Sequence, residues 1–281
     1  MARNGHHDHH DEHDHDRGLS LDLPTLLSRR RLLGLVSAAG VAAVAGCAAD
    51  EPGTPPATTA PSAAAPTSAA AAAAGTKIPE ETAGPFPGDG SNGVNVLTAS
   101  GIVRSDITRS FGTASGVAAG IPLTIGLTVL DTARGSVPLA GAAVYVWHCD
   151  RDGRYSLYTR AVANENYLRG VQETDGSGKV SFTSIYPAAY SGRWPHIHFE
   201  VYPSLAAATT ASGKLRTSQV ALPEDASRAV YATAGYEQSV RNLAQTSLAK
   251  DLVFADGYSL QLGTVTGDPT KGMAVTLTVP V

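Results

Sequence analysis

The sequence predicts an all-β protein, an antiparallel β-sandwich of the two-sheet type with short helical and loop insertions. Three observations favour this fold. Apolar and polar residues alternate over several short stretches after residue 78, as expected for strands with one buried face. Turn signals rich in Gly and Asp, such as TDGSG at residues 174–178, separate these stretches. The remaining length, about 200 residues, suits a single domain.

The strand pattern recurs along the whole domain, and helix is indicated in one segment only. The predicted strands, in chain order, are IPLTIGLTVLD (121–131), AAVYVWHCD (142–150), GKVSFTSIYP (178–187), HIHFEVYP (196–203) and MAVTLTVPV (273–281). Helix is expected within EDASRAVYATAGYEQSVRNLAQTSLAKD, residues 224–251. Many short strands joined by Gly/Asp turns are typical of a sandwich.

Residues 1–46 are expected to be removed before the domain functions. They hold six of the nine histidines in a low-complexity extension. Three arginines, Arg29 to Arg31, then precede an apolar run at 32–45 that is too short to cross a membrane. The order Ser-Arg-Arg-x-Leu-Leu looks like a twin-arginine export signal.

A lipid anchor is expected at Cys47. The preceding Val-Ala-Gly looks like a lipobox, in which the cysteine is acylated and becomes the mature N-terminus. A plain secretory signal with a chance cysteine is the alternative. Residues 47–77, rich in Ala, Pro and Thr, then form a flexible tether, and 78–281 form the folded domain. We therefore expect an exported protein, lipid-anchored on the outer face of the cytoplasmic membrane, with its domain extracytoplasmic.

The net charge argues against a nucleic-acid-binding protein, and the cysteine content argues against a protein stabilised by disulfides. The formal net charge of −4 provides no basic surface for nucleic acid. The chain has two cysteines, and lipidation of Cys47 would leave Cys149 without a disulfide partner. We expect Cys149 to be a buried apolar thiol. No second apolar run is long enough to cross a membrane, so we expect the protein to contact the membrane through the lipid alone.

The stretch YSGRWPHIH, residues 190–198, carries the metal-binding signal. His196 and His198 are two apart in a predicted strand, so both side chains project from one face. Glu200 continues that face and suggests a two-His, one-carboxylate site, but it lies about 13 Å along the strand from His196. Tyr190 can fold back across the Ser-Gly turn instead. A hard trivalent ion would displace its phenolic proton, so this donor set suits ferric iron.

Five sequence blocks resemble those of the intradiol ring-cleavage dioxygenases, the family of the catechol and protocatechuate 3,4-dioxygenases. They are EETAGPFP (80–87), VYVWHCDRDGRY (144–155), TDGSGKVSFTSIYPAAY (174–190), RWPHIHFEV (193–201) and TSQVALPED (217–225). Each block is weakly specific, but their shared order and spacing together are specific.

The resemblance implies a mononuclear Fe(3+) site with two tyrosinates and two histidines. The matching positions are Tyr155, Tyr190, His196 and His198. Tyr158 competes with Tyr155 for the first tyrosine position, and Tyr186 competes with Tyr190 for the second. In the family, the second tyrosine leaves the metal when catechol binds and accepts a substrate proton.

The resemblance also implies the residues that surround the substrate. Arg193 would stabilise negative charge that develops on the bound ring, with a surface ion pair as the alternative. Gln219 would hydrogen-bond near bound oxygen or orient Arg193. The positions matching the family's pocket and its mouth are Trp147, Gln219, Thr82, Gly84 and Pro85. A core tryptophan and a strand-surface glutamine are the alternative interpretations of Trp147 and Gln219.

The implied activity is cleavage of a catechol-type ring by O2, between the two hydroxylated carbons, to a cis,cis-muconate-type product without an organic cofactor. Two other classes stay open. PLAGAAVYVW (138–147) also resembles transthyretin-like binding modules, and a cupin-like enzyme would bind a divalent metal through His196, His198 and Glu200. The segment from Tyr190 to His196 is short for the family, and a helical dimerisation region is missing. The natural catechol and the oligomeric state are therefore not predicted.

Overall fold

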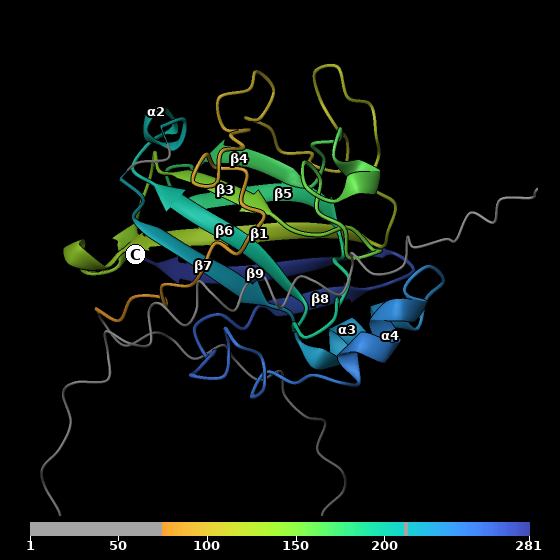
Figure 1. Cartoon of the computed structure of the whole chain (residues 1–281). Helices are drawn as coiled ribbons and strands as arrows, with labels where there is room; N and C mark the ends of the chain where they lie inside the picture. The colour runs from red at the N-terminus through yellow and green to blue at the C-terminus, as the bar shows by residue number, and fades with distance from the viewer. Residues whose placement is uncertain (1–74, 211–212) are drawn as a thin grey trace, which may run out of the picture.

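A computed structural model describes residues 75–210 and 213–281, which form two packed β-sheets (Figure 1). The predicted signal, the lipidation site Cys47 and most of the tether lie outside the described residues. Ile78 is 1% exposed, and its backbone N–H donates to Pro280 at 2.9 Å. Ile78 is thus held beside the end of the last strand.

One sheet has five strands in the order β2-β1-β9-β8, with β5 also paired to β1. Its strands are β1 (Pro122–Asp131), β2 (Val137–Pro138), β5 (Lys179–Ile185), β8 (Thr264–Asp268) and β9 (Gly272–Pro280). The other sheet has the order β4-β3-β6-β7 and is antiparallel throughout. Its strands are β3 (Ala143–Trp147), β4 (Arg169–Glu173), β6 (His196–Tyr202) and β7 (Arg216–Ala221).

Short helices lie in the connections between strands. They are η2 (Thr132–Arg134), η3 (Arg160–Val162), α2 (Leu205–Ala208), α3 (Glu224–Tyr231) and α4 (Glu237–Leu243). Helices α3 and α4 lie together at one end of the sheets (Figure 1) and fall within the segment where the sequence predicted helix. The all-β class and all five predicted strands are confirmed.

One pair of strands departs from the antiparallel pattern of the predicted sandwich. β1 and β9 are parallel, with Leu123 opposite Met273 and Val129 opposite Val279. Parallel neighbours need a long crossover connection. Here the connection runs through the entire four-stranded sheet and the helical segment, so a pattern of hairpin turns does not apply to this pair.

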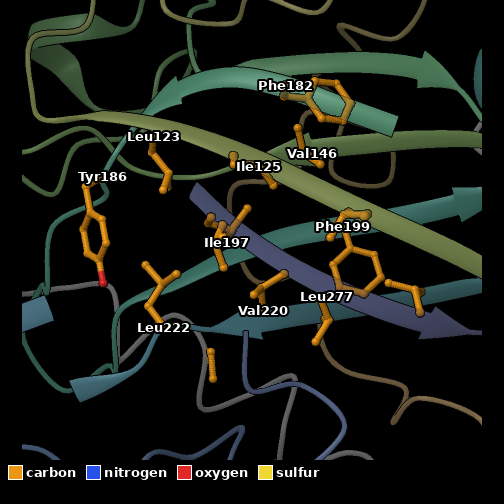
Figure 2. Close-up of a cluster of buried hydrophobic side chains, with 14 of the residues drawn as sticks. Leu123, Ile125, Val146, Phe182, Tyr186, Ile197, Phe199, Val220, Leu222 and Leu277 are labelled. Atoms are coloured by element: carbon orange, nitrogen blue, oxygen red, sulfur yellow. The ribbon is translucent and has the colours of Figure 1, made fainter. Parts of the chain in front are cut away.

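The main core lies between the two sheets, where the alternating residues of both meet (Figure 2). β1 contributes Ile125, and β6 contributes Ile197 and Phe199; all three are fully buried. These residues occupy every second position, which matches the alternation seen in the sequence. Cys149 is buried as predicted, and its thiol is 3.7 Å from the carbonyl of Ala188.

The outer face of the four-stranded sheet is buried too, and this is where the predicted site lies. A second cluster, which includes Tyr145, Trp147 and Tyr202, covers that face. The segment after Ile78, drawn in orange in Figure 1, crosses it and receives a hydrogen bond at Pro87 from Tyr145. Every residue of β6 is therefore buried, including its polar residues. Buried polar side chains require partners or a metal ion.

Candidate metal centre

His196 and His198 project together from the outer face of β6, as the sequence predicted. Their Nε2 atoms are 3.1 Å apart, and their ring planes meet at 79°. The pKa values of both imidazoles lie well below the ordinary range, because burial disfavours the charged form and nearby Arg193 adds to that effect. Two neutral rings therefore direct nitrogen atoms toward one point.

The backbone fixes the tautomer of His196. Its Nδ1 is 2.5 Å from the carbonyl oxygen of Trp194, which can only accept a hydrogen bond. Nδ1 therefore carries the proton, and the lone pair of Nε2 is free to bind a metal ion. His198 differs, because its Nδ1 is buried without a hydrogen-bond partner among the described residues.

Tyr190 folds back over the Ser191-Gly192 turn and reaches the histidines. Its Oη is 3.3 Å from Nε2 of His196. Gly192 has a φ of +78°, a left-handed conformation that glycine adopts without strain, and the N–H of Arg193 closes the turn onto the carbonyl of Tyr190. Its competitor Tyr186 instead hydrogen-bonds Ser227 and belongs to the core between the sheets.

Tyr155 approaches from the turn that follows β3. Asp150 accepts two backbone hydrogen bonds in that turn, from Asp152 and Arg154, each at 2.9 Å. The ring centroid of Tyr155 lies 6.0 Å from that of Tyr190 and 6.2 Å from that of His198. Its competitor Tyr158 is engaged elsewhere, since its hydroxyl pairs with Gly88 and Asn92.

The hydroxyl of Tyr155 is buried and makes no hydrogen bond among the described residues. Burial, and secondarily the neighbouring Tyr190, raise the pKa of this phenol well above its usual value. Buried polar atoms without partners are uncommon in folded proteins. Three of the six such side-chain atoms in the described part of the chain, namely Trp147 Nε1, Tyr155 Oη and His198 Nδ1, lie at this site.

Four donors thus converge on one place, two imidazole nitrogens and two phenol oxygens. This donor set fits a hard trivalent cation such as ferric iron, which would displace the phenolic protons and satisfy the oxygen of Tyr155. Within the described residues, no group of three or more His, Cys, Asp or Glu side chains is placed to hold a metal ion. A site here therefore depends on its tyrosines.

Glu200 takes no part in the donor set, although it shares the face of the histidines. One of its oxygens pairs with Lys214 Nζ at 2.6 Å, and the other accepts from Tyr202 at 2.6 Å. Lys214 also binds Asp89 at 2.5 Å. The carboxylate is therefore committed to a separate ion cluster, which counts against the cupin-like alternative.

Arg193 places a buried positive charge beside the donors. Its side chain is 1% exposed, and its Nε donates to Asp251, which is fully buried, at 2.9 Å. Nη2 donates to Oε1 of Gln219 at 2.7 Å, and Gln219 donates in turn to the carbonyl of Thr82 at 3.0 Å. The surface ion pair considered for Arg193 is therefore wrong, as is a surface position for Gln219.

The residues predicted at the mouth lie on one segment. Thr82 is buried, and its hydroxyl accepts from the N–H of Gly84 at 3.0 Å. Pro85 is half-buried and accepts from Asn92. Phe86, which was not predicted, packs its ring 4.9 Å from that of Tyr155. This segment therefore contacts the donor Tyr155 through Phe86, and it contacts Gln219 through the carbonyl of Thr82.

Two polar residues of the site carry no signal in the sequence. Asp251 follows Arg193 by 58 residues and lies in a loop without a motif. Arg169, 1% exposed, donates to the carbonyls of Phe86, Pro87 and Ser156, so it ties the mouth segment to the loop of Tyr155. Only contacts between distant segments identify these residues.

Comparison with known proteins gives concordant matches. A family model described as Dioxygenase matches residues 102–211. The chain is similar to catechol 1,2-dioxygenase 2 of Acinetobacter lwoffii, 43% identical over 54 residues, which are 19% of each chain. It is also similar to chlorocatechol 1,2-dioxygenase of Rhodococcus opacus, 36% identical over 63 residues, or 22% of this chain and 24% of the relative. The alignments therefore span less than a quarter of these curated relatives.

A solved structure matches over a larger part of the domain. An intradiol ring-cleavage dioxygenase from Tetranychus urticae is 26% identical, with a TM-score of 0.51, and the match covers 65% of this chain and 87% of that one. This likeness extends well beyond the short segments shared with the curated relatives.

Proposed function

Because the chain belongs to the intradiol ring-cleavage dioxygenase family, we propose that it is a non-haem ferric enzyme that cleaves catechol-type rings with O2. Cleavage falls between the two hydroxylated carbons and gives a cis,cis-muconate-type product. The observation that carries the proposal is the convergence of Tyr155, Tyr190, His196 and His198 from three separate segments. The names of the curated relatives support a catechol as the substrate class.

Ferric iron bound by these residues would lower the pKa of the catechol hydroxyls and draw electron density from the ring, which opens the ring to O2. Tyr190 is the donor best placed to exchange with substrate. It is 8% exposed, whereas the other three donors are 2–3% exposed, and half-buried residues of its turn flank it. With iron bound, Tyr190 would be the residue that yields to the substrate, as the resemblance implies, and its Oη would accept a catechol proton.

Arg193 stabilises the negative charge that the ring acquires. The guanidinium is fixed in advance by Asp251 and Gln219, so it needs no reorganisation when that charge develops. Gln219 acts on Arg193 directly, which agrees with the orienting role considered from the sequence. The segment of Thr82, Gly84 and Pro85 closes the outer face of the sheet and limits the entry of water.

Aerobic incubation of the purified, iron-loaded protein with a panel of catechols tests the proposal. We expect visible absorption from ferric tyrosinate and ring-opened acids that carry both atoms of O2, detected by mass with labelled dioxygen. A colourless protein that binds Zn or Fe(II) would favour the cupin-like class. A colourless protein that binds ring compounds without turnover would favour a transthyretin-like module.

We also propose that the enzyme is exported and held at the outer face of the cytoplasmic membrane by a lipid on Cys47. The supporting observation is the order of arginines, apolar run and small residues before this cysteine. In the described residues, no helix has the length and apolar character needed to cross a membrane. Cys47→Ala is expected to move the protein from the membrane to the soluble fraction, and a variant that still sediments with membranes would contradict lipid anchoring.

A further inference from the structure

We infer that Trp147 is a positioning residue that holds the metal ligand His198 in place by ring stacking, the task that a hydrogen bond performs for His196. The inference rests on the proposed function and deepens it. It concerns how this chain prepares its own imidazoles, and it assigns Trp147 a role that does not require contact with the substrate.

The two histidines are held in different ways. His196 donates from Nδ1 to the carbonyl of Trp194 at 2.5 Å, which fixes both the tautomer and the ring plane. His198 has no such partner, since its Nδ1 is buried and makes no hydrogen bond within the described residues. Metal-binding histidines usually donate their second N–H to a carboxylate, a carbonyl or water. His198 therefore needs another device to fix its ring.

Trp147 provides that device. It lies directly opposite His198 in the antiparallel pair of β3 and β6. The two rings are nearly parallel, with an interplanar angle of 8° and centroids 4.8 Å apart. Trp147 is fully buried, so its indole cannot turn away into solvent. Stacked aromatic rings attract each other beyond the effect of the area that they bury.

The indole of Trp147 is itself held in place by Tyr145, which lies two residues earlier on β3. Tyr145 stacks on Trp147 with centroids 4.9 Å apart and an interplanar angle of 20°. The hydroxyl of Tyr145 donates to the carbonyl of Pro87 at 2.7 Å and accepts from Arg169 at 3.0 Å. A hydrogen-bonded anchor at Tyr145 thus determines the position of Trp147, which determines that of His198.

The consequence is an asymmetry between the two imidazoles. His196 is polarised by a carbonyl acceptor and is the stronger donor, whereas His198 lacks that polarisation. The affinity of His198 for the metal therefore depends on the preformed orientation of its ring. Removal of the indole should therefore loosen ferric iron even though no metal-binding atom has been removed.

The test compares Trp147→Met, which fills the space without a flat ring, with Trp147→Phe, which keeps a ring. The protein is loaded with ferric iron, and the rate of iron release to a competing chelator is followed through the visible absorption. We expect release to be roughly two- to tenfold faster in Trp147→Met, the range that corresponds to the strength of one aromatic pair, and Trp147→Phe to lie near the wild type. The visible band should also shift in Trp147→Met.

Phe182→Leu is the matched control. Phe182 is an equally buried aromatic residue, but it belongs to the core between the sheets (Figure 2). We expect this variant to lower the melting temperature as much as Trp147→Met while it releases iron at the wild-type rate. If Trp147→Met does not fold, Tyr145→Leu removes the ring behind the indole and should accelerate release by a smaller factor.

Two outcomes would overturn the inference alone. One is a coloured wild type whose iron release is unchanged in both Trp147→Met and Tyr145→Leu. The other is a variant in which KM for catechols rises while iron release stays at the wild-type rate, since that result would make Trp147 a substrate contact. A wild type that binds no ferric iron would instead overturn the proposed function, and this inference with it.

Discussion

At the scale of single residues, the two tyrosines of the site have separate tasks because their surroundings differ. Tyr155 is enclosed by Phe86 and is 2% exposed, whereas Tyr190 sits next to a half-buried turn and is 8% exposed. A ligand that must leave and accept a proton needs room to move. The more accessible phenol is therefore the one that we expect to exchange.

Tyr190→Phe removes this proton acceptor and keeps the ring. We expect kcat/KM for catechol to fall by about a hundredfold or more, the usual contribution of a positioned acid-base group. Steady-state kinetics on iron-loaded protein measure the effect. Tyr186→Phe is the matched control, because Tyr186 hydrogen-bonds Ser227 in the core and should leave turnover close to the wild type. Equal activity of Tyr190→Phe and the wild type would contradict the assignment.

The ion pair of Arg193 and Asp251 should contribute to stability as well as to catalysis. Both side chains are buried, and Asp251 also accepts hydrogen bonds from the backbone of Trp194 and Val253. Asp251→Asn leaves the guanidinium buried without a countercharge, so we expect about 3 kcal/mol less stability toward urea unfolding. Glu224→Gln, which breaks an exposed pair with Arg228, should have little effect. A loss in Asp251→Asn no larger than in this control would show that the buried pair is not needed for stability.

The sequence could predict the two histidines because a strand's period of two is a local property. It could not choose between Tyr155 and Tyr158 in the same way. The choice depends on Gly88 and Asn92, which occupy the hydroxyl of Tyr158 from about 70 residues away. Ser227 excludes Tyr186 by the same kind of long-range contact. Partners of this kind leave no pattern in a local stretch.

At the scale of elements, strand prediction succeeded where alternation is undisturbed. β1 alternates cleanly and buries every second residue. β4, with the sequence RGVQE, was missed because Arg169, Gly170 and Val171 are buried in succession, on both faces of the strand, and two of the three are not large apolar residues. The burial of β4 therefore does not appear in the sequence as hydrophobic alternation.

Gly170 illustrates how tightly the segment of Val103 and Ile107, which precedes β1 in the chain, packs on β4. A Cβ at this position would lie 2.5 Å from Cγ2 of Ile107, and Val103 pairs with Val171 in a parallel bridge beside it. We expect Gly170→Ala to destabilise the domain by about 1–3 kcal/mol through overpacking, measured by urea unfolding. Gly176→Ala, where nothing lies within 4 Å of the added atom, should be close to neutral. A neutral Gly170→Ala would mean that Ile107 can move aside at little cost.

At the scale of the whole molecule, the site depends on segments that are far apart in the chain. The segment of residues 80–97 crosses the outer face of the four-stranded sheet, and the backbone N–H of Glu81 donates to the carbonyl of Thr217 on β7 at 2.8 Å. Neither this coverage nor the parallel pairing of β1 and β9 follows from local pattern. Both are consequences of long connections. The resemblance to a family predicted that Thr82, Gly84 and Pro85 lie near the site, but it did not predict the parallel pairing.

The same coverage buries Glu81, and this should make the stability of the whole domain depend on pH. Burial, followed by the negative charge of Asp256, raises the pKa of Glu81 to about 7. A hydrogen bond from Gln261 and the positive charge of Arg193 lower this pKa more weakly, and the negative charge of Asp251 raises it slightly. Because the folded state holds this proton more tightly than the unfolded state, its contribution is fully present below about pH 4.5. It is lost as the pH rises toward 7.

Glu81→Gln removes the titrating carboxyl and keeps its shape and its hydrogen bond to Gln261. We expect the variant to be more stable than the wild type at pH 8, by up to about 3 kcal/mol, since no charge must then be buried. At pH 4 the two proteins should unfold at nearly the same urea concentration, which provides the internal control. Urea midpoints between pH 4 and pH 8 measure the difference. If the two curves stay parallel across this range, titration of Glu81 does not change the stability of the domain, and the prediction is wrong.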